Sequence, residues 1–158
     1  MTKSNSDFKT RRLLNNAKKW VIGGGLFNCF AAFPFAMPFL SDAYINLFNK
    51  INIFLGLGGV SWEAPSAGAN MLFLNTAGLA LFLVGITLIY ASREIAERIE
   101  IPFLNGVIRF FWSIIATYYI VMYEVIHIMF IIVVIDLILA MAFTYYYYQI
   151  KMIRESRS

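Results

Sequence analysis

Long uninterrupted runs of apolar residues dominate the chain. Four of them are long enough to cross the hydrocarbon core of a bilayer as a helix, which takes about 20 residues for roughly 30 Å. They cover residues 20–40, 70–92, 105–123 and 128–148. The polar sequence between them is too short for a separate soluble domain. The pattern predicts a single all-α membrane domain over residues 1–158, an integral membrane four-helix bundle with tails at 1–19 and 149–158.

The connection between the first two runs begins with an amphipathic stretch. Between residues 44 and 55, apolar side chains fall on one helical face, opposite Asn46, Asn49 and Lys50. Glycines at positions 56, 58 and 59 then end this helix. We expect the segment to lie in the outer membrane interface, either as a lipid-surface anchor or as a lid over a site between the helices.

The other two connections are short. Residues 93–100 alternate in charge, and Glu94 and Arg98 are spaced for an ion pair on one helix. This spacing predicts a helical extension of the second run that ends at Pro102. Only residues 124–127 separate the third and fourth runs, so these two should form an antiparallel hairpin.

Basic residues lie almost entirely on one side of the predicted spans. Of the 13 lysines and arginines, only Lys50 lies on the other side. Because cytoplasmic loops carry the basic excess, both termini are predicted to be cytoplasmic, which requires an even number of spans. The twelve residues on the basic side are Lys3, Lys9, Arg11, Arg12, Lys18, Lys19, Arg93, Arg98, Arg109, Lys151, Arg154 and Arg157. A cleaved signal peptide would leave three spans instead, but the first run is long for one and contains Pro34 and Pro38.

Composition agrees with a membrane protein. The chain is 60% hydrophobic and 14% charged, with a mean hydropathy of +0.69, whereas soluble domains carry about 25% charged residues. The net charge of +4 sits in short segments beside the spans, where it meets anionic lipid, so nucleic acid is not an expected partner. We expect the cell membrane as the location, and membrane lipid with other membrane subunits or further copies of the chain as partners.

One acidic residue lies deep in a predicted span. Asp136 is about 12 Å below the outer boundary of the fourth run and about 18 Å above its inner boundary. A charged group at this depth costs at least about 2.5–3.5 kcal/mol, so Asp136 must be protonated or held by hydrogen-bond donors. The rise of 1.5 Å per helical residue gives the height of each polar side chain above the inner end of its span. These heights suggest an intramembrane polar pocket formed by Asp136 with Asn28, Thr117, Tyr118 and Arg109.

Two questions about this pocket stay open at the sequence level. By residue count, Arg109 lies closer to the cytoplasmic boundary than Asp136 does. Its side chain therefore either reaches upwards and pairs with Asp136 through water or Tyr118, or extends to the cytoplasmic headgroups. Asp136 itself is either a protonatable or ligand-binding acid, or an interhelical hydrogen-bonding residue that fixes the packing of the fourth span.

Residues for enzymatic chemistry are sparse. His127 is the single histidine and Cys29 the single cysteine, so neither a paired-histidine haem site nor a metal cluster is expected. Gly23-Gly24-Gly25 lacks the Lys-Ser/Thr that follows in a phosphate loop, and close helix packing explains it better. No cofactor or metal is predicted, and an enzyme is the weaker functional class.

The second half of the chain resembles the DoxX-like small four-helix proteins of the bacterial inner membrane. The resemblance lies in LIYASREI, NGVIRFFWSIIATYYI and IIVVIDLILAMAF, with Arg93 after the second span, Arg109 in the third and Asp136 in the fourth. It implies a four-span bundle and often an accessory role, without a defined substrate.

Two function classes follow. The chain is either a non-catalytic accessory or scaffold subunit of a membrane assembly, or a small-molecule, lipid or proton-handling protein that uses the pocket around Asp136. A four-span transferase of the glutathione-handling type has a suitable length but needs an Arg/Asn/Glu motif that the second span lacks.

Overall fold

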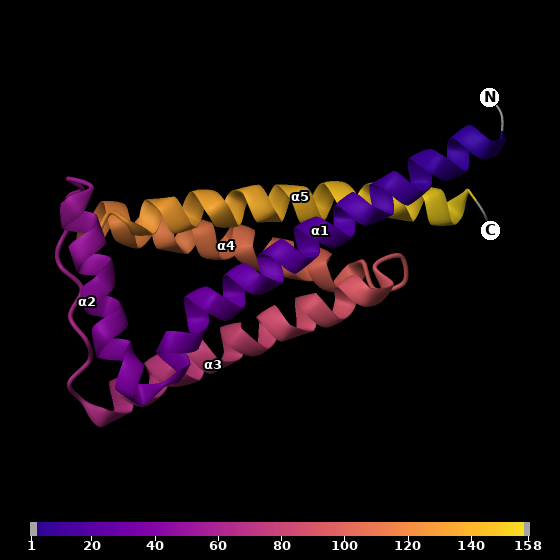
Figure 1. Cartoon of the computed structure of the whole chain (residues 1–158). Helices are drawn as coiled ribbons and strands as arrows, with labels where there is room; N and C mark the ends of the chain where they lie inside the picture. Colours follow the sequence, from indigo (N-terminus) through magenta and orange to yellow (C-terminus); the bar gives the residue numbers. More distant parts are fainter. Residues whose placement is uncertain (1–2, 157–158) are drawn as a thin grey trace.

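The structure is a computed structural model that describes residues 3–156 as α-helices joined by short connections (Figure 1). The helices are α1 (Lys3–Ala36), α2 (Pro38–Phe54), α3 (Gly68–Ala91), α4 (Glu100–Tyr123) and α5 (Met129–Glu155), with a 3-10 turn, η1 (Ser92–Glu94), after α3. No strand occurs between residues 3 and 156. Arg157, one of the basic residues counted for topology, lies outside the described residues.

The first predicted span ends earlier than its apolar composition indicates. We expected a kinked helix over 20–40, but α1 stops at Ala36 and α2 starts at Pro38, with a bend of 115° between them. Pro38 has no N–H for the Pro34 carbonyl, so the hydrogen-bond ladder breaks there. The prediction of one span through residue 40 was therefore wrong, although the apolar part of α1, residues 20–36, is still about 26 Å long.

The backbone groups freed by this break find new partners. The Ser41 hydroxyl lies 3.4 Å from the Pro34 carbonyl oxygen and 3.1 Å from that of Met37. Asn75 of α3 donates to the Phe35 carbonyl at 2.7 Å and to the Ser41 oxygen at 3.1 Å. These bonds hold the bend against α3, because an unsatisfied peptide group in an apolar environment costs several kcal/mol.

The predicted amphipathic segment is the second half of α2, and its packing differs in part from the prediction. Asn49, expected on the polar face, exchanges two hydrogen bonds with the backbone of Trp62. Asn52 is buried, donates to the carbonyls of Leu57 and Gly58, and accepts from the Ile128 N–H. Most of the predicted apolar face points outwards, with Phe54 at 87% exposure, as expected of a lipid-surface anchor. The helix ends before the glycines, as predicted.

Glycines bring α1 and α3 into close contact. A methyl group added to Gly78 would lie 2.5 Å from the Ala36 nitrogen, and one added to Gly25 would lie 2.8 Å from the Gly85 carbonyl oxygen. Gly24 faces Phe143 of α5 in the same way, at 2.6 Å. The close helix packing predicted for Gly23-Gly24-Gly25 is confirmed for Gly24 and Gly25, whereas nothing lies within 4 Å of a methyl group added to Gly23.

The connection between α3 and α4 is not a continuous helix. We predicted that α3 extends as a helix to Pro102, but the chain forms η1 and turns, and α4 already begins at Glu100 with Pro102 in its first turn. Proline is well accommodated there, since the first N–H groups of a helix have no helical partner. The predicted ion pair between Glu94 and Arg98 is present.

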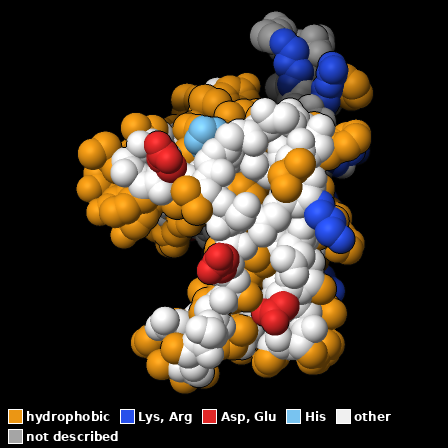
Figure 2. All heavy atoms as spheres, turned by 90° about the vertical axis from the view of Figure 1, so that its left-hand side faces the viewer, with side chains coloured by type: hydrophobic (Ala, Val, Ile, Leu, Met, Phe, Trp, Pro, Cys, Tyr) orange, Lys and Arg blue, Asp and Glu red, His pale blue; other side chains and the backbone are white. Residues whose placement is uncertain are grey.

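The outer surface of the helices is strongly apolar. Large side chains such as Leu83 of α3, Ile115 of α4 and Val134 of α5 are more than half exposed. Three helical stretches, Gly68–Glu94, Glu100–Tyr123 and Met129–Glu155, are long and apolar enough to cross a membrane, and the bent α1–α2 pair makes a fourth if counted as one span. Figure 2, viewed onto the α2 end, shows scattered charged side chains among apolar ones. Both ends of the described chain lie at the opposite end (Figure 1).

Neighbouring glycines of α1 provide a test of the α1–α3 packing. Gly25→Ala should lower the stability by about 1–3 kcal/mol, because its methyl group meets the α3 backbone. Gly23→Ala is the matched control, since nothing lies within 4 Å of its added methyl group, and it should gain about 0.5–1 kcal/mol in helix propensity. Thermal unfolding of both purified variants in detergent measures the difference. Equal stability of the two variants would contradict the packing.

Candidate functional site: the buried ion pair and its cavity

Asp136 of α5 forms a direct ion pair with Arg109 of α4. The guanidinium Nη1 donates to the Asp136 Oδ1, and the two residues are only 5% and 7% exposed. The register of α4 and α5 brings them together. Gly106 lies against Ala140 and Phe143, and counting along both antiparallel helices from this contact places Asp136 about 3 Å above Arg109.

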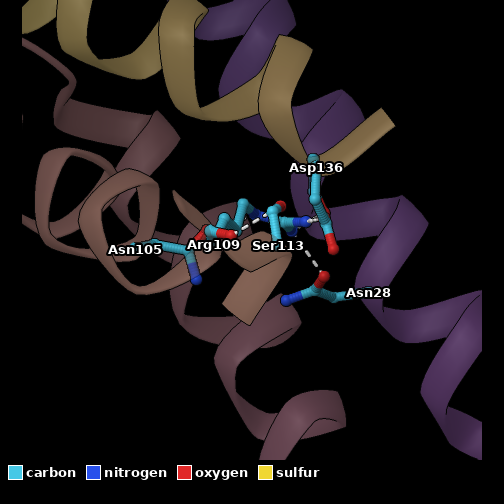
Figure 3. A network of polar contacts seen from close by, with 6 residues as sticks. Asn28, Asn105, Arg109, Ser113 and Asp136 are labelled. Carbon is cyan, nitrogen blue, oxygen red and sulfur yellow. Dashed lines mark hydrogen bonds and ion pairs between the residues drawn. The ribbon is translucent and has the colours of Figure 1, made fainter. Parts of the chain in front are cut away.

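Three further groups complete the surroundings of Arg109. Its Nε donates to the Asn105 Oδ1 at 2.7 Å, and its Nη2 donates to the Asn28 Oδ1 and lies 3.4 Å from the Gly24 carbonyl oxygen. Figure 3 shows the side chains of Asn28 and Asn105 reaching the guanidinium from α1 and from α4 itself. Arg109 therefore links three helices, because its planar fork of donors contacts acceptors on each of them.

Of the two alternatives left open for Arg109, the structure shows pairing with Asp136, but by direct contact. No bridging water or tyrosine is needed between Arg109 and Asp136, and the arginine does not extend to the cytoplasmic headgroups. The height count placed Asp136 level with Thr117 because it assumed that the third and fourth spans end at the same level. The contact at Gly106 shifts that register by about six residues, or one and a half turns.

The five predicted pocket residues therefore divide into two groups. Asn28, Arg109 and Asp136 meet as described. The Thr117 hydroxyl instead donates to the Ser113 carbonyl in its own helix at 2.7 Å, and Tyr118 is 52% exposed. Asn105 was missed, although its position four residues before Arg109 places both on one face of a helix.

A cavity of about 170 Å³ adjoins the ion pair. The α1–α3 pair and the α4–α5 pair diverge towards the end where α2 lies (Figure 1), and every α-helix contributes to the walls. Representative apolar lining residues are Phe27 of α1, Phe48 of α2, Leu81 of α3, Trp112 of α4 and Ile132 of α5. The polar lining consists of Asn28, Asn105, Arg109 and Asp136. The cavity is thus an apolar chamber with polar groups gathered at one side.

The chemistry available here is binding by hydrogen bonds and apolar contacts. The ion pair carries no net charge, and residues 3–156 contain no cluster of three or more His, Cys, Asp or Glu side chains suited to a metal ion. No family model, curated protein or solved structure matches the chain.

Replacing one member of the ion pair tests its structural importance. Asp136→Leu should destabilise the protein by about 3–5 kcal/mol, because it leaves the Arg109 charge buried without its partner. Adding Arg109→Met to this variant should restore part of that loss, since no unpaired charge then remains while the Asn28 and Asn105 oxygens lose their donor. Chemical unfolding in detergent is the measurement.

Glu100→Gln is the control for this experiment. Its ion pair with Arg154 is about half exposed, so solvent screens it and the loss should stay below about 1 kcal/mol. If the double variant is no more stable than Asp136→Leu alone, the buried ion pair between Arg109 and Asp136 is refuted.

Proposed function

We propose that the chain is a non-catalytic integral membrane protein of the bacterial inner membrane, an accessory or scaffold subunit of a larger membrane assembly. The observation that carries this proposal is the Arg109 network, in which the one deep acid is engaged by a neighbouring helix. A carboxylate held in an ion pair carries no proton to release, and removing either partner would leave a buried charge without compensation.

The proposal includes a four-helix bundle with both termini in the cytoplasm. In this proposal the apolar part of α1, about 26 Å long against a hydrocarbon core of roughly 30 Å, crosses the bilayer. The α2 helix then lies along the outer surface with its exposed apolar side chains in the interface. Support comes from the basic residues of both tails and of the α3–α4 connection. The DoxX-like resemblance of the second half belongs to this proposal, since it implies the same architecture and an accessory role.

A second candidate function is the handling of a small molecule or lipid. The cavity beside Asp136 favours it, because ligand sites are mostly apolar chambers with a few convergent polar groups. Proton handling receives less support, since Asp136 is already paired with Arg109.

Cysteine labelling tests the topology. In a Cys29→Ser background, Ser61→Cys should react with a membrane-impermeant maleimide in intact cells, because residue 61 belongs to the α2–α3 connection outside. Lys9→Cys and Ser156→Cys should react only after the cells are permeabilised. Labelling of either terminal cysteine in intact cells would exclude the proposed orientation.

Purification and flux measurements test the function. In mild detergent we expect a stoichiometric membrane partner to co-purify with the chain, whereas a homo-oligomer alone would argue against an accessory subunit. Liposomes that contain wild type or Asp136→Asn should show equal proton flux, measured with an internal pH dye. A flux that disappears in folded Asp136→Asn would favour proton handling instead.

A further inference from the structure

Arg109 dictates how the two neighbouring amides are oriented. An arginine side chain has donors only, so the oxygens of Asn28 and Asn105 must face the guanidinium, as their contacts show. Each amide NH₂ group is consequently turned away from Arg109. The amide orientation thus follows from the chemistry of the donor.

Both NH₂ groups are left without a partner. Within residues 3–156 the Nδ2 atoms of Asn28 and Asn105 make no hydrogen bond, although the residues are only 7% and 8% exposed. The second carboxylate oxygen of Asp136, Oδ2, also has none. All three residues line the cavity, and none of their polar atoms is both fully buried and unpaired. The unused donors and the unused acceptor thus belong to residues that line the chamber.

We infer that this cavity binds a neutral, lipid-soluble alcohol. A hydroxyl group accepts and donates, so it complements the Asn28 and Asn105 amides and the Asp136 oxygen together. The Arg109–Asp136 pair already balances its own charge, and an ionic headgroup would enter an otherwise apolar chamber at a high cost. This inference rests on the second of the two functions proposed above.

The size and position of the cavity limit the ligand. An engineered apolar cavity of about 150 Å³ holds one benzene ring, so about 170 Å³ suits a ring or short chain bearing one hydroxyl. Leu81 of α3 and Ile108 of α4 line the cavity and are 51% and 63% exposed, so the proposed entrance lies between α3 and α4. A ligand dissolved in the bilayer enters there, as a hydroxyl-bearing segment of a lipid or as a free small alcohol.

Three probes of similar shape test the inference with the full-length protein in mild detergent. Benzyl alcohol donates and accepts, acetophenone only accepts, and ethylbenzene does neither. After correction for partition into protein-free micelles, each hydrogen bond should strengthen binding by about three- to tenfold. The expected order is benzyl alcohol, then acetophenone, then ethylbenzene, measured by saturation-transfer NMR. Equal affinities, or no saturable binding, would overturn the inference and leave water as the occupant of the polar side.

A cavity-filling variant locates the binding. Ala32→Leu adds bulk to the wall and should abolish binding of benzyl alcohol, whereas Ala80→Leu, on the exposed face of α3, should leave it unchanged. Equal binding by both variants would overturn the location, and the three-probe series on wild type remains decisive if Ala32→Leu does not fold.

The source of the alcohol follows from solvent extraction of the purified protein. A hydroxyl-bearing lipid found by mass spectrometry in Ala80→Leu and lost in Ala32→Leu identifies a lipid, and saturable benzyl alcohol binding without it identifies a free alcohol. None of these measurements depends on a protein partner. A negative result would therefore argue against the bound alcohol and would not contradict the proposed accessory function.

Discussion

The arrangement of the helices depends on one constraint, the cost of a carboxylate surrounded by apolar side chains. Asp136 lies too deep in α5 to reach an aqueous boundary, so its charge requires a partner inside the protein. Arg109 supplies that partner but brings further donors of its own, which Asn28, Asn105 and the Gly24 carbonyl accept. The close fit of Gly24 against the Phe143 side chain and of Gly106 against the Ala140 backbone is therefore part of the same requirement, since bulkier residues would separate the three helices.

The bend between α1 and α2 shows the same requirement for neutral groups, since buried peptide carbonyls also need hydrogen-bond partners. Pro38 interrupts the helical ladder, and the freed carbonyls of Pro34 and Phe35 are satisfied by Ser41 and Asn75. Polar residues in the apolar segments thus serve particular local needs. Ser41 and Asn75 hold the bend, Asn52 holds the loop after α2, and the Arg109 network holds the centre.

Most of the helical content was predictable, because apolar runs of span length are a strong signal for a membrane chain. Hydropathy does not register a backbone break, and residues 37–40 are almost as apolar as those before them, so the end of α1 at Ala36 was missed. The direct contact between Arg109 and Asp136 was missed for a different reason. Its formation depends on the register of α4 against α5, which is set by Gly106 at Ala140 and Phe143 and not by the positions where the runs end. Asn105 was recoverable from its spacing to Arg109 alone.

Structural and binding roles are combined in the same side chains. The oxygens of Asn28 and Asn105 accept hydrogen bonds from Arg109, and both residues also line the cavity. A substitution of either asparagine therefore disturbs the ion pair and the chamber together, and its effect on a ligand cannot be separated from its effect on the fold. Ala32 contributes to the apolar wall without a side-chain hydrogen bond, so a change there alters the space and leaves the charges in place. The apolar wall, rather than the polar side, is where stability and recognition separate.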